Sequence, residues 1–200
     1  RMYKEAGVSW EYEKVLRRLE NKFNSLIGVS GCIFAIRKKL YEKLDNSLIE
    51  DFALPLMVLE KGYKVVLEKE AIAYEDAVLR PKDEFARKAR IVSGGINALF
   101  YMRRLLNPLK NPKLSFQLIS HKIFRWFAPV FFISLFISNI FLANEGIFFG
   151  TFFILQSLLY GLAFAGFKIP SHFLLLNAAA VAGIFKFLRK DNLPIWEPTR

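Results

Sequence analysis

Three long runs without a charged side chain limit most strongly what this chain can fold into. They cover residues 126–144, 146–167 and 169–185. A helix needs about 20 apolar residues to cross the ~30 Å hydrocarbon layer of a bilayer. A soluble domain of this size could not bury two such helices at once. The first two runs, with their flanks, therefore predict membrane spans at about 123–144 and 147–167.

The third run predicts a helix at about 170–188, with two open interpretations. It is shorter and contains Asn177, and its small residues suit close helix packing in lipid: Ala178, Ala179, Ala182 and Gly183. A third crossing would place the cations near the C-terminus opposite those before the first span, against the positive-inside rule. A re-entrant or interfacial helix would keep both groups on one side. The cations concerned are Lys110, Lys113, Lys122 and Arg125 before the first span, and Lys186, Arg189, Lys190 and Arg200 after the last.

Composition excludes several classes of protein. With 54% hydrophobic residues the chain is not intrinsically disordered, and with Cys32 as its one cysteine it is not a disulfide scaffold. The net charge of +11 is compatible with nucleic acid, but acidic and basic residues alternate through residues 1–121, which is a poor electrostatic footprint for nucleic acid. The first apolar run of spanning length begins after residue 120, and Cys32 is unpaired. We therefore expect residues 1–121 on the cytoplasmic side of a multi-pass cell membrane protein.

Residues 1–121 alternate helix and strand patterns, which predicts an α/β unit. The predicted helices are 9–23, 38–44, 51–61 and a stretch from 82 to 106 that is broken at Ser93-Gly94-Gly95; the predicted strands are 28–37, 63–68 and 71–75. We expect an α/β region at 1–95, an interfacial helix and linker at 96–121, and a membrane region at 122–200. By residue count such a chain is predominantly helical.

The segment 96–107 has the composition of a helix that lies in the membrane interface. Ile96, Leu99, Phe100 and Leu106 fall on one side of the predicted helix, and Arg103 and Arg104 on the other. An ordinary amphipathic helix packed on the α/β region is the alternative.

Three features carry potential chemistry. Glu50-Asp51 precedes an apolar helix; Asp51 is either an N-cap or a carboxylate able to take a proton from a hydroxyl nucleophile. Arg87 and Arg90, one turn apart in a basic run, are either a solvated helix face or a pair of guanidinium groups suited to pyrophosphate. The small residues Val29-Ser30-Gly31 would let backbone approach a ligand.

Taken in order, four segments resemble the second half of membrane-integrated family 2 glycosyltransferases. They are GVSGCIFAIRKKLY, IEDFALPLMVLEKGYKVVLEKEAIAYE, FARKARIVSGG and SHKIFRWFAPVFF, and the likeness extends to the closing WEPTR. This inverting group of GT-A type includes synthases of cellulose, hyaluronan and poly-N-acetylglucosamine. The resemblance implies a partial GT-A domain followed by transmembrane helices.

The resemblance also implies residue roles. The Thr-Glu-Asp motif of the family falls on Ile49-Glu50-Asp51, so that Asp51 would be the general base, with Glu50 beside it. The family's Gln-x-x-Arg-Trp motif falls on residues 87–91, where Arg90 matches the arginine that contacts the donor pyrophosphate. Arg87 replaces the glutamine, and Ile91 replaces the tryptophan that helps to hold the acceptor sugar. Ser30 and Gly31 would line the acceptor site.

The implied partners are a nucleotide-sugar donor (a UDP-sugar is expected), a glycan or lipid-linked acceptor, and membrane lipids. Such enzymes use a divalent cation, Mg²⁺ or Mn²⁺, but no Asp-x-Asp motif occurs in this sequence. We therefore expect the chain to be a fragment whose nucleotide-binding half and metal ligands precede Arg1, and to be inactive alone. The alternative is a non-catalytic, basic, membrane-anchored adaptor that binds a partner protein or anionic lipid.

Overall fold

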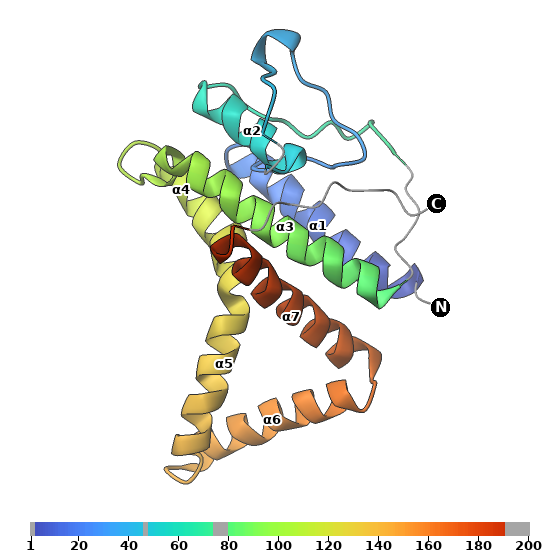
Figure 1. The fold of residues 1–200 in the computed structure, drawn as a ribbon, viewed down its shortest axis with the longest axis vertical. Helices are drawn as coiled ribbons and strands as arrows, with labels where there is room; N and C mark the ends of the chain where they lie inside the picture. Colours follow the sequence, from blue (N-terminus) through green and yellow to red (C-terminus); the bar gives the residue numbers. More distant parts are fainter. Residues whose placement is uncertain (1–2, 46–47, 74–79, 191–200) are drawn as a thin grey trace.

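The computed structural model describes residues 3–45, 48–73 and 80–190, and it is built from helices and irregular segments (Figure 1). The described α-helices are α1 (Tyr3–Phe23), α2 (Glu50–Glu60), α3 (Pro81–Tyr101), α4 (Pro112–Leu118), α5 (Phe124–Leu142), α6 (Ile147–Phe164) and α7 (Lys168–Leu188). Short turns are η1 (Lys38–Leu40), η2 (Arg103–Leu106) and the π-helical η3 (Ile119–Ile123).

Helix α2 forms the centre of the part of the chain that precedes the apolar runs. Its residues from Phe52 to Val58 are all buried. The helix ends before Gly62, which has φ of +80°, a left-handed conformation that favours glycine at a helix stop. The prediction of this helix from the sequence is confirmed, whereas the helix predicted at 38–44 is limited to the single turn η1.

The predicted strands are not present in the described residues. Segments 28–37, 63–68 and 71–73 are irregular, and residues 74–75 lie outside the described part. Leu26 and Val65 are joined by one backbone hydrogen bond of 3.0 Å, with Ser25 Oγ accepting from the Val65 N–H at 2.8 Å. A strand needs a neighbour along its whole length, and these segments have only such isolated contacts. The α/β prediction is therefore unconfirmed, while the predominance of helix is confirmed.

Helix α3 continues through Ser93-Gly94-Gly95, so the predicted break there is wrong. Gly95 is needed for packing: a Cβ at this position would lie 2.5 Å from Cζ2 of Trp126. The predicted domain boundary after residue 95 lies inside this helix. The segment predicted as an interfacial helix comprises the last turns of α3 and η2; it buries Leu99, Met102 and Leu105, while Phe100 remains exposed.

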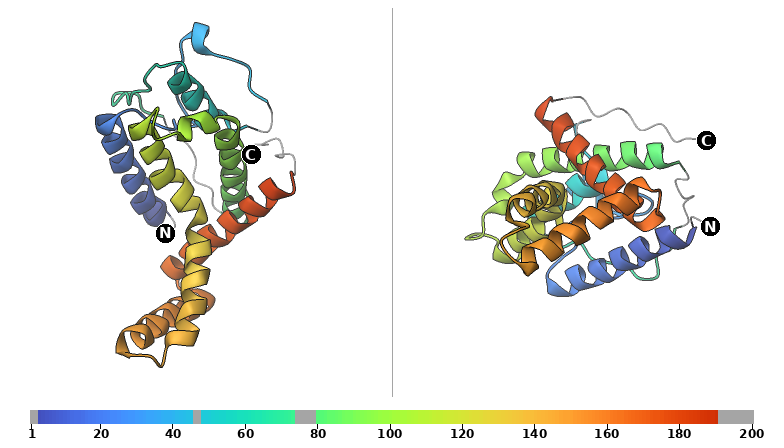
Figure 2. Two further views of the ribbon diagram at one scale, coloured as in Figure 1. Left: turned by 90° about the vertical axis from the view of Figure 1, so that its left-hand side faces the viewer. Right: turned by 90° about the horizontal axis from the view of Figure 1, so that it is seen from below.

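Helices α3 and α7 lie side by side and run in the same direction (Figures 1 and 2). His172 lies 3.8 Å from Glu84 near their beginnings, and the Phe187 and Phe100 rings are 6.4 Å apart near their ends. Between these contacts, a Cβ at Gly183 would lie 2.6 Å from the Ala89 carbonyl oxygen. Of the small residues predicted to pack closely in lipid, Gly183 packs on α3 and Ala179 is buried, whereas Ala182 is partly buried and Ala178 is exposed.

Helices α5, α6 and α7 form three sides of a triangle that projects from the rest of the molecule (Figure 1). All three are long and apolar enough to cross a membrane, α5 as the C-terminal part of a continuous helical segment, Pro112–Leu142. Gln156 of α6 bridges to α5: its Nε2 donates to the Phe132 carbonyl at 2.9 Å, and its Oε1 accepts from Asn139 Nδ2 at 3.3 Å. Such side-chain bonds stabilise helix pairs where water is absent.

The contact at Gly183 gives a direct test of the α3–α7 arrangement. We expect Gly183→Ala to lower the thermal midpoint of the detergent-solubilised chain, because the new methyl group overpacks the interface at a cost of about 1–3 kcal/mol. Gly161→Ala is the matched control, since a Cβ at Gly161 of α6 meets nothing within 4 Å. Equal midpoints for the two variants would contradict the packing described above.

Candidate active site

Asp51 lies in the first turn of α2, but it is not the N-cap. Ile49 occupies the cap position, and no side chain caps the helix there. The expectation that Asp51 is an N-cap is therefore wrong, and no capping hydrogen bond occupies its carboxylate. The carboxylate is partly buried.

Pro55 links Asp51 to the small-residue segment at 28–31. Proline has no N–H, so Pro55 cannot donate to the carbonyl of Asp51 four residues earlier. That carbonyl instead accepts a 2.8 Å hydrogen bond from the N–H of Val29. The bond brings Gly31 over the carboxylate, so that a Cβ at Gly31 would lie 3.4 Å from Asp51 Oδ2. Because Gly31 is exposed and has no side chain, the carboxylate remains open to solvent on this side.

Four cations surround the Asp51 carboxylate: Lys122, Arg17, Arg90 and Arg87. Burial raises the pKa of Asp51 above its ordinary value, and the four cations oppose this rise without cancelling it. The candidate residues Asp51, Arg87 and Arg90 thus interact electrostatically with one another.

Arg90 has an unused hydrogen-bond donor. Its Nε is buried and has no hydrogen-bond partner in the described part of the chain. Burial lowers the pKa of Arg90, while Asp51 favours and Arg87 disfavours its charged form; an arginine nevertheless stays charged in a protein. A buried, unpartnered guanidinium N–H next to an exposed arginine, Arg87, is a suitable site for an anion.

The other predicted site residues, Glu50, Ser30 and Ile91, have no described side-chain contact with the Asp51 carboxylate. Glu50 is exposed, and no hydrogen bond or ion pair joins it to the described residues. Ser30 is partly buried next to Gly31, and its hydroxyl accepts a 3.4 Å bond from the Cys32 N–H. Ile91 is partly buried on α3, and no described contact brings it to Asp51. The structure therefore gathers Asp51, Gly31, Arg87 and Arg90, but not Glu50 or Ile91.

Lys122 is a site residue that the sequence analysis used only as a marker of membrane sidedness. It lies in the π-helical turn η3, just before α5, and π-helical turns are frequent at functional sites. Its Nζ is 5.1 Å from the centroid of the Phe52 ring, next to Asp51, and 3.7 Å from the position of a Cβ at Gly28. The segment SHKIFRWFAPVFF contains the signal, but only the fold shows which cation reaches the carboxylate.

Two acids of α1 hold the beginning of the first membrane helix beside this site. Glu20, which is 5% exposed, lies 2.8 Å from Nδ1 of His121, and Glu13 lies 3.4 Å from Arg125. Burial alone would raise the pKa of Glu13, but Arg125, Lys122 and Arg17 together lower it. The Glu20–His121 hydrogen bond and the Glu13–Arg125 ion pair hold η3 and the start of α5, and therefore hold Lys122 in place.

Trp126 of α5 connects the same helix to α2 and α3. Its ring meets Phe52 edge to face with 5.9 Å between centroids, and it covers Gly95. Trp126 is itself buried and belongs to the central hydrophobic cluster. Through this side chain the membrane helix contacts both helices that carry candidate residues.

The model of the family described as glycosyl transferase family group 2 matches residues 12–185, which include every element of this site. The chain belongs to this family. No curated protein and no solved structure matches the chain. Membership of a glycosyltransferase family makes the chain a transferase, and glycosyl transfer in general requires a sugar donor and an acceptor.

The opposite pKa shifts of Asp51 and Glu13 predict opposite effects on stability. The raised pKa means that the folded protein holds the Asp51 proton more tightly than the unfolded protein does. The free energy of unfolding therefore falls as the pH rises from the ordinary pKa of this carboxyl group to its raised pKa. We expect Asp51→Asn to raise the thermal midpoint at neutral pH. Glu13, with a lowered pKa, contributes stability above its ordinary pKa, so Glu13→Gln should lower the midpoint.

Thermal unfolding in detergent at neutral pH and near pH 4 checks both signs. Each difference from the unsubstituted chain should be smaller near pH 4. The Asp51 penalty is lost as the pH falls below its raised folded-state pKa, and the Glu13 contribution begins to be lost as the pH falls below its ordinary pKa. A lower midpoint for Asp51→Asn at neutral pH would show that its carboxylate is stabilised, not desolvated.

Proposed function

We propose that this chain is the acceptor-side half of an inverting, GT-A-type glycosyltransferase that works at a membrane, with Asp51 as its general base. In this reaction Asp51 accepts the proton of an acceptor hydroxyl. The acceptor oxygen bonds to the anomeric carbon of the sugar, and the bond from that carbon to the nucleotide phosphate breaks with inversion.

The observation that carries this proposal is the environment of the Asp51 carboxylate. It is uncapped, open beside Gly31, and has a pKa raised by burial. A general base works best when its pKa approaches the operating pH, so a raised carboxyl pKa suits this role. The nearby cations favour the ionised carboxylate and limit the rise of its pKa.

Arg90 and Arg87 are the proposed contacts of the departing pyrophosphate. The free, buried Nε of Arg90 offers a preorganised donor where negative charge develops on the leaving group. Because Asp51 and Arg90 interact, the base and the leaving-group contact fall within one site. This matches the reaction, in which the acceptor and the nucleotide bond to the same carbon.

Ser30 and Gly31 are the proposed acceptor side of the site. Gly31 leaves space directly over Asp51 Oδ2, where a hydroxyl must lie in order to lose its proton. Ile91, in place of the family's tryptophan, offers an aliphatic surface without the stacking face that suits a sugar ring. We propose a glycan or other hydroxyl-bearing acceptor and a nucleotide-sugar donor, with a UDP-sugar as first choice.

The metal of this reaction class does not fit the residues present. Among the described residues no three His, Cys, Asp or Glu side chains form a group able to hold an ion, and the sequence has no Asp-x-Asp motif. We propose that the cation, Mg²⁺ or Mn²⁺, is held by a nucleotide-binding half outside these 200 residues.

Exposed apolar side chains support the proposal of a covering half. Val66 and Ile72, in segments predicted as strands, are 71% and 69% exposed, and Ile33 and Phe34 are exposed as well. On α1, Val15, Leu19 and Phe23 are about half exposed. These are the residues that a sheet and its covering helices would bury. A non-catalytic adaptor would explain the charge and the apolar helices but gives no reason for family membership.

The proposed location is the cytoplasmic face of the cell membrane. The three apolar helices support membrane association. Phe127, near the start of α5, and Phe187, near the end of α7, line the same groove, so both ends of the apolar region return to one place. This geometry favours the interpretation in which the chain enters the membrane through α5 and returns to the same side through α6 and α7. The cations before α5 and those after α7 then lie on one side of the membrane.

Substitution of Asp51 tests the base. In membranes that contain the complete enzyme, Asp51→Asn should reduce sugar transfer from a labelled nucleotide-sugar by roughly 10²–10⁴-fold, the contribution of a general base. Membrane insertion should be unchanged. Glu60→Gln, an exposed carboxylate at the other end of α2, is the control and should retain activity. Full activity in Asp51→Asn would remove Asp51 from the mechanism.

The separate halves test the division of labour. The purified 200-residue chain, supplied with labelled UDP-sugars and Mg²⁺ or Mn²⁺, should transfer no sugar above background. The reason is that its described residues include no group of carboxylate, histidine or cysteine side chains able to hold the cation. Transfer by this chain alone, abolished by a chelator, would show that its own residues bind the metal.

A further inference from the structure

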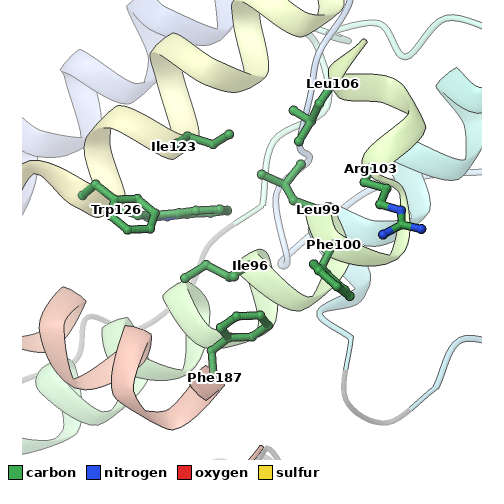
Figure 3. Close-up of a pocket in the computed structure, with 9 residues that line it drawn as sticks. Ile96, Leu99, Phe100, Arg103, Leu106, Ile123, Trp126 and Phe187 are labelled. Atoms are coloured by element: carbon green, nitrogen blue, oxygen red, sulfur yellow. The ribbon is translucent and has the colours of Figure 1, made fainter. Parts of the chain in front are cut away.

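An apolar groove of about 200 Å³ lies where α3, α5 and α7 meet (Figure 3). Leu99, Leu106 and Ile96 line one side, and Ile123 and Trp126 face them from the other. Phe100, Phe127, Phe187 and Arg103 complete the lining. The guanidinium of Arg103 points away from Ile123 and Trp126, so it lies at the edge of the groove and not inside it.

The groove lies at the boundary between charged and apolar sequence. Trp126 and Phe127 begin α5 directly after Arg125, and Phe187 ends α7 just before Arg189 and Lys190. Aromatic side chains flanked by cations are typical of the headgroup level of a bilayer. At the headgroup level of a bilayer, an open apolar groove is next to the hydrocarbon chains of lipids. A chain that enters the groove would replace water in contact with the apolar side chains that line it.

The rim of the groove is positively charged. Arg103 is its one charged lining residue; it lies over the Phe100 ring, 5.8 Å from the centroid. Arg103 is exposed, and no carboxylate pairs with it in the part of the chain that the structure describes. Arg104 follows it and is also exposed. An unpaired arginine at the mouth of an apolar groove is complementary to a phosphate attached to a hydrocarbon chain.

Trp126 separates the groove from Asp51. One side of its ring system lines the groove, while the same side chain packs on Gly95 and against Phe52, the neighbour of Asp51. A hydrocarbon chain in the groove would therefore contact Trp126 without reaching the carboxylate. This arrangement favours a resident membrane lipid over a lipid-linked acceptor, whose reacting end would have to lie at Asp51.

We propose that this groove binds one acyl chain of an anionic membrane phospholipid, with the lipid phosphate on Arg103. The site is distinct from the sugar-transfer site; it rests on the proposed membrane location but not on the proposed reaction. Its ligand is defined by two features, a flexible hydrocarbon chain and a phosphate that carries net negative charge.

Quenching of Trp126 fluorescence by brominated lipids tests the site. Trp10→Phe and Trp196→Phe leave Trp126 as the one tryptophan of the 200-residue chain. The chain is placed in phosphatidylcholine nanodiscs that contain a minor fraction of acyl-brominated phosphatidylglycerol or, for comparison, of acyl-brominated phosphatidylcholine. We expect brominated phosphatidylglycerol to quench with about fivefold higher relative affinity, the factor that one arginine near the membrane surface supplies.

Arg103→Gln should remove this preference, and Arg104→Gln, the matched control outside the groove lining, should keep most of it. Equal quenching by both brominated lipids, or none by either, would overturn the proposal, as would a preference that survives Arg103→Gln. Unbrominated phosphatidylglycerol should reverse the quenching. Reversal by a polyprenyl phosphate but not by phosphatidylglycerol would assign the groove to a lipid-linked acceptor instead. Because the readout is fluorescence, loss of sugar transfer has no bearing on it.

Discussion

The close approach of Trp126 to Gly95 holds the two parts of this molecule together. Any side chain at Gly95 would occupy the space of the indole ring, and the ring also meets Phe52 edge to face. One residue of the first membrane helix thus contacts α3, which carries Arg90, and α2, which carries Asp51. The ion pairs of Glu13 and Glu20 with Arg125 and His121 hold the same region from the other side. The candidate site is assembled on the beginning of α5, a helix long and apolar enough to cross a membrane.

The sequence predicted the helices well where the apolar pattern is long. The three long apolar helices, α1 and α2 follow from local periodicity. The roles of Asp51 and Arg90 rest on family resemblance and remain predictions. The strands at 28–37 and 63–68 failed because a strand depends on neighbours that these residues do not provide. The break at Ser93-Gly94-Gly95 failed because the weak helix propensity of glycine was outweighed by a tertiary contact with Trp126, which lies 31 residues later in the sequence.

The role of Lys122 shows what local sequence cannot supply. In the sequence it is one of several cations before an apolar run, and their distribution indicates only membrane sidedness. The π-helical turn brings its ammonium group beneath Phe52 and near Gly28. Similarly, Pro55 reads as a helix-start residue, whereas its missing N–H leaves the Asp51 carbonyl free to hold Val29. Both effects depend on segments that meet only in the folded chain.

The parallel packing of α7 on α3 has a mechanical consequence. The two helices touch at both ends and at Gly183 between them, so neither can slide or tilt far without the other. Since α7 follows directly on α6, a re-orientation of α6 would be passed through α7 to the helix that carries Arg87 and Arg90. The spacing between the two guanidinium groups and the Asp51 carboxylate is thereby linked to the position of α6.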